Sequence, residues 1–151
     1  MAGKRVRQID LRADIVGCRA SVFRPTILNV TADNGEHFVV LSAEAPANCE
    51  AEHRCGGAPD SMTLVWLAIR ADLSLESKQV FVIEDCWEDR ALDGEPVDNG
   101  DWDEWREKLL SQSHGAFTMN FAESTADGEV SGRVTYNRRA ARSGLQITRS
   151  N

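Results

Sequence analysis

The sequence predicts a mainly β fold of the α+β type: an antiparallel sheet or a two-layer sandwich of hairpins, with one helix packed on it around residues 102–113. Three observations support this. Apolar and polar residues alternate over short segments, turn dipeptides separate those segments, and a single stretch has helical spacing. No strand–helix–strand alternation appears, so a Rossmann-type fold is not expected. The 151 residues suffice for a single domain, 1–151. Residues 1–12 are expected to form a flexible basic arm.

The clearest hairpin surrounds Asp127-Gly128, a turn dipeptide between two alternating segments. A two-residue loop there would place Phe121 opposite Val134 and Met119 opposite Tyr136. One face of this hairpin is then apolar: Phe117, Met119, Phe121, Val130, Val134 and Tyr136. The other face is polar: Thr118, Asn120, Ser124, Ser131, Arg133 and Thr135. Because the side-chain period of a strand is 2, a slip by one residue would destroy this separation.

A second hairpin is predicted at Asn34-Gly35, a dipeptide that favours a type I′ turn. Its register would place Leu28 opposite Leu41 and Val30 opposite Val39. Apolar residues occur on both faces of this pair, so we expect burial on both sides. Pro25 limits the first strand upstream, because proline lacks the N–H that a sheet ladder needs.

A third strand pair is expected at 62–70 and 78–85, with a loop over 71–77 centred near Ser74. The continuous apolar runs 64–69 and 80–83 are typical of strands covered on both faces. A short last strand is predicted at 145–148.

The predicted helix begins at Asp101, whose side chain can cap it, with Glu104 three residues later. Trp102, Trp105 and Leu109 follow at helical spacing. Gly115 would end the helix.

The four cysteines, Cys18, Cys49, Cys55 and Cys86, lie outside or at the ends of the apolar runs. An even number at irregular spacing predicts two disulfides, and disulfides persist in oxidising compartments. The pairing Cys55–Cys86 with Cys18–Cys49 is preferred among three connectivities. A periplasmic or secreted protein whose leader has been removed is therefore expected. The alternative is a cytoplasmic protein with free thiols, since no signal peptide is visible.

Two metal sites are weaker alternatives, and no cofactor is expected. The residues Cys49, His53, Cys55 and Cys86 could form a Cys₃His zinc site, although no Cys-x₂-Cys pair is present. The carboxylates of Asp98, Asp101 and Asp103 could bind calcium, but their spacing does not match an EF-hand loop.

Negative charge is concentrated between residues 84 and 108, which hold eleven of the 24 acidic residues of a chain whose net charge is −7. This balance argues against nucleic-acid binding, which needs clustered Lys and Arg. The apolar stretches are too short for a membrane span. The acidic segment instead predicts a protein partner with a basic surface, bound through Trp87, Glu88, Asp89, Asp93, Glu95 and Asp98.

The sequence carries no nucleophile elbow and no glycine-rich phosphate loop, so catalysis is not expected. The prediction is a small extracytoplasmic protein-binding module, of the inhibitor or immunity type, that occludes a secreted enzyme or toxin. One alternative is a structural or assembly subunit that self-associates. A second is a hydrolase that uses carboxylates or a bound metal.

Overall fold

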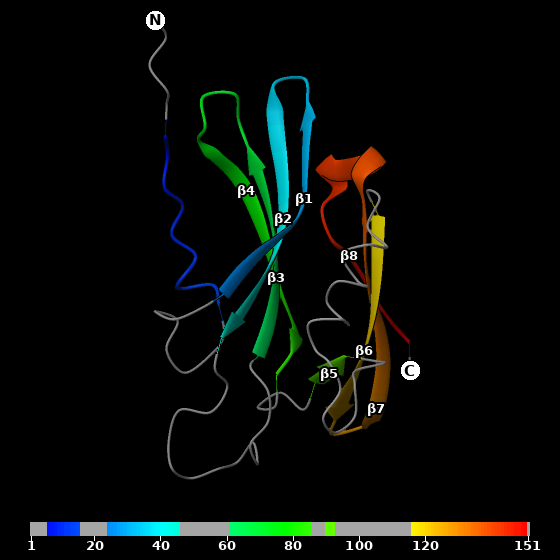
Figure 1. The fold of residues 1–151 in the computed structure, drawn as a ribbon. Helices are drawn as coiled ribbons and strands as arrows, with labels where there is room; N and C mark the ends of the chain where they lie inside the picture. Colours follow the sequence, from blue (N-terminus) through cyan, green and yellow to red (C-terminus); the bar gives the residue numbers. More distant parts are fainter. Residues whose placement is uncertain (1–5, 16–23, 46–60, 86–89, 93–115, 151) are drawn as a thin grey trace, which may run out of the picture.

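The structure, a computed structural model, describes residues 6–15, 24–45, 61–85, 90–92 and 116–150. These residues form two four-stranded antiparallel sheets, each with its strands in chain order (Figure 1). The first sheet contains β1 (Arg24–Asp33), β2 (Glu36–Ala45), β3 (Ser61–Ile69) and β4 (Leu75–Glu84). The second contains β5 (Arg90–Leu92), β6 (Ala116–Thr125), β7 (Gly128–Asn137) and β8 (Gln146–Ser150), with the 3₁₀ helix η2 (Arg138–Ser143) before β8. The prediction of a mainly β, antiparallel fold is confirmed. The predicted helix at 102–113 lies outside the described residues.

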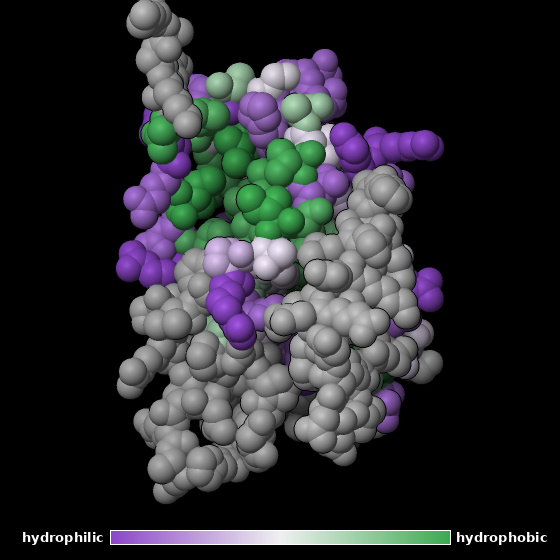
Figure 2. All heavy atoms as spheres, in the orientation of Figure 1, coloured by the Kyte–Doolittle hydropathy of each residue, from purple (hydrophilic) through white to green (hydrophobic). Residues whose placement is uncertain are grey.

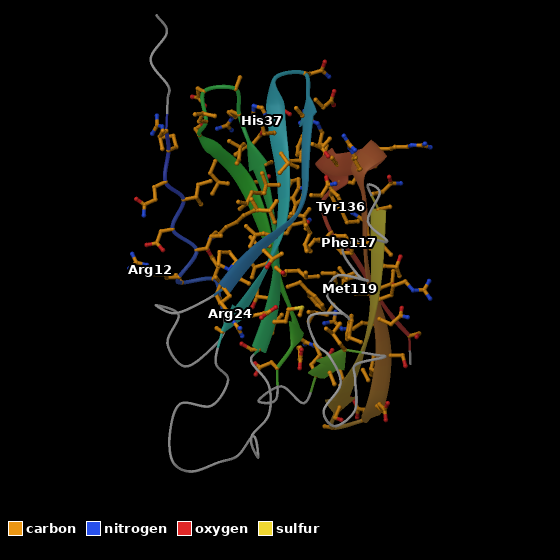
Figure 3. The ribbon with its side chains drawn as sticks, in the orientation of Figure 1. Arg12, Arg24, His37, Phe117, Met119 and Tyr136 are labelled. Carbon is orange, nitrogen blue, oxygen red and sulfur yellow. The ribbon has the colours of Figure 1, made fainter. Side chains whose placement is uncertain are left out.

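The two sheets face each other across one apolar core, as in a two-layer sandwich. The first sheet contributes side chains from β2, β3 and β4, among them Val40, Leu64 and Ile83. The second contributes Phe117, Met119, Phe121, Val134 and Tyr136. Figure 3 shows Phe117, Met119 and Tyr136 pointing from the second sheet toward the first. The predicted apolar face of the β6–β7 hairpin is therefore the inner face of this sheet, and five of its six members are buried.

In the β6–β7 hairpin, each residue of β6 lies opposite a residue of β7 that is two positions earlier than predicted. Thr125 pairs with Gly128, so the loop residues are Ala126 and Asp127. Met119 consequently lies opposite Val134, and Phe121 lies opposite Gly132. Gly128, with a φ of 124°, follows the turn. A shift by a whole pair keeps every side chain on its face, which is why the predicted inner and outer faces are correct although the predicted partners are wrong.

The β1–β2 hairpin turns at Asn34-Gly35 with φ values of 49° and 82°, as a type I′ turn requires. Val30 lies opposite Val39 as predicted, but Ile27 takes the place expected for Leu28 opposite Leu41. The cause is a β-bulge between Ile27 and Asn29, which leaves Leu28 as an extra residue.

The β3–β4 hairpin turns earlier than expected. Its loop is Arg70–Ser74, closed by a hydrogen bond of 2.9 Å from the Arg70 N–H to the Ser74 carbonyl. Strand β3 is buried on both faces, as its apolar run predicts. The expectation for β4 is wrong, because Val80 is 37% exposed at the edge of the sheet.

The outer face of the first sheet forms a second apolar cluster with the N-terminal segment 6–15. Leu11 and Ile15 are buried against Leu41, Val65 and neighbouring residues of β2 and β3. Lys78 of β4 forms an ion pair with Asp14, which fixes the segment across the sheet. Within residues 6–12 of the expected flexible arm, Ile9 and Leu11 pack on the sheet, whereas Val6 is 78% exposed and Arg12 is turned outward (Figure 3).

Candidate protein-binding surface

The residues predicted from the acidic segment lie outside the described part of the chain. This applies to Trp87, Glu88, Asp89, Asp93, Glu95 and Asp98, and equally to Cys18, Cys49, Cys55 and Cys86. Their proposed roles in partner binding and in disulfides stay predictions. The same holds for the zinc alternative and for the calcium alternative.

The structure does describe the two residues that flank the connection 86–89. Asp85 and Arg90 form an antiparallel bridge, in which each backbone N–H donates to the carbonyl of the other at 2.9 and 3.0 Å. The chain therefore leaves the first sheet and enters the second through a short connection whose two ends are hydrogen-bonded.

Two arginines, one of them Arg90 of this bridge, donate hydrogen bonds to the carboxylate of Glu123. The Arg90 guanidinium donates to Glu123 at 2.8 Å, and Arg149 donates to the other carboxylate oxygen at 3.2 Å. Both guanidinium groups also lie within 6 Å of the Phe81 and Phe121 ring centres, a geometry that favours cation–π attraction. The group joins β4, β5, β6 and β8.

The hydrogen bond from Arg90, followed by that from Arg149, holds the pKa of Glu123 below its ordinary value of 4.5. A carboxylate whose pKa is lowered in the folded state stabilises the fold at a pH above its unfolded pKa. This stabilisation is lost as the pH falls through the lowered folded value. Urea unfolding should therefore show that Glu123→Gln is less stable than the wild type at pH 7, with the difference shrinking in strongly acidic buffer. A constant difference across pH would contradict this assignment.

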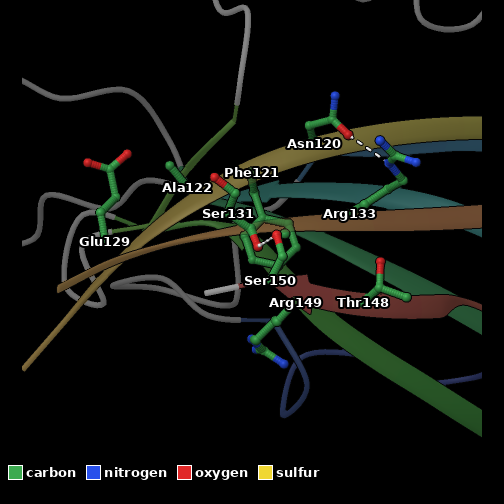
Figure 4. A pocket seen from close by; sticks show the side chains of 10 residues that line it. Asn120, Phe121, Ala122, Glu129, Ser131, Arg133, Thr148, Arg149 and Ser150 are labelled. Carbon is green, nitrogen blue, oxygen red and sulfur yellow. Dashed lines mark hydrogen bonds between the residues drawn. The ribbon is translucent and has the colours of Figure 1, made fainter. Parts of the chain in front are cut away.

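The outer face of the second sheet carries a polar groove of about 490 Å³, formed by β6, β7 and β8. Figure 4 shows Arg133 donating to Asn120 on one side, and Ser150 donating to the Ser131 carbonyl on the other. The groove is open, and its lining combines three charged residues, Glu129, Arg133 and Arg149, with polar and apolar ones.

Strand β1 carries the most unusual surface in the described part of the chain. Ile27 is 64% exposed and Val30 is 53% exposed, and both lie on the outer face of the first sheet, next to buried Leu41 and half-buried Val39. Figure 2 shows hydrophobic side chains gathered at the surface over the part of the molecule where β1 to β4 lie. Contiguous exposed apolar patches mark interaction sites in many soluble proteins, whereas single exposed apolar residues do not.

One side of the β1 backbone also faces away from the other described strands. Among the described strands β1 pairs with β2 alone, so it forms one edge of the sheet. In a two-residue hairpin the pair next to the turn, here Asp33 and Glu36, is hydrogen-bonded, and alternate pairs along the ladder are not. The residues opposite His37, Val39, Leu41 and Ala43 therefore direct their backbone groups away from β2. These residues are Ala32, Val30, Ile27 and Pro25.

Sequence reasoning missed this surface. It treated the β1–β2 hairpin as buried on both sides, which holds for β2 but not for β1. Pro25 was the available signal, because proline within a strand pattern indicates an edge.

Among the described residues, no three His, Cys, Asp or Glu side chains are grouped as a metal site would require, and no helix is long and apolar enough to cross a membrane. No protein-family model, no curated protein and no solved structure matches this chain.

Proposed function

We propose that this protein is a small protein-binding module that acts by covering a surface of its partner rather than by catalysing a reaction. The observation that carries the proposal is the exposure of Ile27 and Val30 on an edge strand whose backbone groups face outward. An extended segment of a partner can add to such an edge, with backbone hydrogen bonds giving affinity and side chains giving specificity.

The acidic segment indicates which charge the partner's surface is expected to carry. Between residues 84 and 108 acidic residues outnumber basic ones by eleven to three. Such a charge concentration steers a basic surface toward the module and raises the association rate more than the final affinity. The partner we propose is a secreted enzyme or toxin with a basic surface, and the module is of the inhibitor or immunity type. Two disulfides and a periplasmic or secreted location belong to this proposal.

The test compares immobilised wild-type protein with two variants in a secreted or periplasmic extract of the source organism. Ile27→Lys places a charge on β1, and Ile147→Lys, at a residue that is 40% exposed on β8, is the matched control. We expect the wild type and the control to retain a partner that Ile27→Lys loses.

The identified partner is then purified and its affinity is measured with all three proteins. A lysine in the centre of the contact should weaken binding by more than about 1 kcal/mol, which is more than about fivefold in Kd. The association rate of the wild type should also fall with added salt. Equal binding by Ile27→Lys and Ile147→Lys would exclude β1 as the binding surface.

A further inference from the structure

The sequence of β1 is complementary to itself when it is reversed about its bulge. Leu28 and Asn29, at the bulge, both face the core: Leu28 packs against the core cluster, and Asn29 accepts a hydrogen bond from Tyr136 of β7 at 3.3 Å. On either side of this pair the faces alternate in mirror order. Ile27 and Val30 face outward, followed by Thr26 and Thr31 facing inward, Pro25 and Ala32 outward, and Arg24 and Asp33 inward.

We propose that the edge of β1 binds a second copy of this chain, so that two first sheets join into one eight-stranded antiparallel sheet around a two-fold axis between Leu28 and Asn29. The inference rests on the proposed use of β1 as a binding surface and names one occupant of it. A two-fold axis at this position pairs each residue with one that lies on the same face, as an antiparallel ladder requires. A shift of the axis by one residue in either direction would oppose inward and outward side chains in the bulged region.

The paired residues also match chemically. Ile27 meets Val30 of the second copy, which brings together four exposed β-branched side chains around the axis. Thr26 meets Thr31 of the second copy. Arg24, whose side chain is 67% exposed and 3.5 Å from Glu44, meets Asp33 of the second copy with opposite charge.

The backbone fits the same arrangement. Ile27 and Val30 both direct their N–H and carbonyl groups outward, so each Ile27–Val30 pair can exchange two hydrogen bonds. Pro25 has no N–H, but its carbonyl can accept from Ala32 of the second copy. Proline there removes nothing from the β1–β2 ladder, and in the dimer it leaves each Pro25–Ala32 pair with one hydrogen bond instead of two. The dimer would also shield an exposed hydrophobic edge from uncontrolled association until a partner displaces the second copy.

The first experiment measures the mass of the full chain by analytical ultracentrifugation over a concentration series. The wild type should form a species of twice its 16.7 kDa mass. Val30→Lys places two lysines close to the axis and should raise the dimer dissociation constant at least tenfold, while Ile147→Lys should leave it unchanged. Thermal unfolding of both variants checks that they are folded. A wild type that stays monomeric, or a dimer that Val30→Lys does not weaken, would overturn the proposal.

The second experiment tests the register. Ile27→Cys and Val30→Cys are prepared separately, oxidised alone and as a mixture, and their crosslinked peptides are identified by mass spectrometry after digestion. In an antiparallel pair, opposite Cα atoms lie about 4.5 to 5.5 Å apart, within the range of a disulfide. We expect a crosslink between positions 27 and 30 in the mixture, and none between two copies of position 27. A dimer without the 27–30 crosslink would overturn the proposed axis.

The outcomes separate this proposal from the proposed function. A monomeric wild type whose partner binding depends on Ile27 would overturn the dimer and retain the binding module. A dimer with the 27–30 crosslink, in a protein that retains no other protein through β1, would retain the dimer and overturn the module.

Discussion

Replacing Gly144 by alanine should lower the free energy of unfolding by about 2 to 5 kcal/mol, because two separate penalties meet at this residue. Gly144 follows η2 with a φ of 68° and a ψ of −152°, a backbone conformation that is essentially restricted to glycine. A side chain there imposes about 1 to 3 kcal/mol of strain.

The second penalty is the loss of a hydrogen bond, because the flexible end of Gln79 can avoid an added Cβ only by moving away from its partner. A Cβ atom on Gly144 would lie 2.1 Å from the Oε1 atom of Gln79, an oxygen that accepts the Leu145 N–H at 2.6 Å. This hydrogen bond ties the entry of β8 to β4. Next to it, the Trp66 indole N–H donates to the Ala141 carbonyl at 2.9 Å and ties β3 to η2. An added methyl group would displace Gln79 and leave the buried Leu145 N–H without its acceptor.

Urea denaturation of three variants separates the two penalties. Gly128→Ala is the control for backbone strain, because Gly128 has a φ of 124° and no atom lies within 4 Å of its added Cβ. Gln79→Ser removes the obstacle and also the acceptor. In the double variant Gly144→Ala/Gln79→Ser the losses should be less than additive, since the collision no longer exists. If Gly144→Ala is no more destabilising than Gly128→Ala, the contact with Gln79 has no energetic weight.

The hairpin assignments show which parts of this fold a sequence can predict. The inner and outer faces of β6 and β7 follow from alternation, because burial of one face tolerates no shift by a single residue. The exact turn does not follow, since Asp127-Gly128 and Ala126-Asp127 are both acceptable loops that leave the same side chains buried. Alternation also gave no indication of the bulge at Leu28. An extra residue among Ile27, Leu28 and Asn29 is determined by contacts with other strands, here Val40 and Tyr136.

The candidate surface on β1 could not be predicted from the sequence, for a related reason. Apolar alternation says that a strand borders a core, but it does not say which strand forms the edge of a sheet. Val30 and Val39 have the same residue type and lie opposite each other, yet Val30 is 53% exposed on β1 while Val39 packs against the outer cluster. The difference arises from the strand order, which is a property of the assembled sheet. Charge, by contrast, is visible in the sequence, and the acidic segment 84–108 stays the predicted source of electrostatic steering.

Gly132→Ala should destabilise the protein by about 1 to 3 kcal/mol without any contribution from backbone strain. Gly132 lies directly opposite Phe121 on the inner face of the β6–β7 hairpin, and the Phe121 ring covers it. An added Cβ would lie 2.1 Å from the Cζ atom of this ring. An aromatic ring that covers a glycine on the neighbouring strand is a known stabilising device in sheets, and it depends on the missing side chain.

The ring has no room to move aside. Phe121 is 1% exposed, its centre is 5.2 Å from that of Phe81, and the Arg90 and Arg149 guanidinium groups each lie 5.8 Å from it. Moving it would therefore disturb the arginines that hold Glu123. Phe121→Leu should be destabilising alone, yet it should reduce the penalty of Gly132→Ala, because leucine is shorter than the ring that collides. A double-mutant cycle by urea denaturation measures this coupling, and strictly additive losses would mean that the ring does not rest on Gly132 in solution.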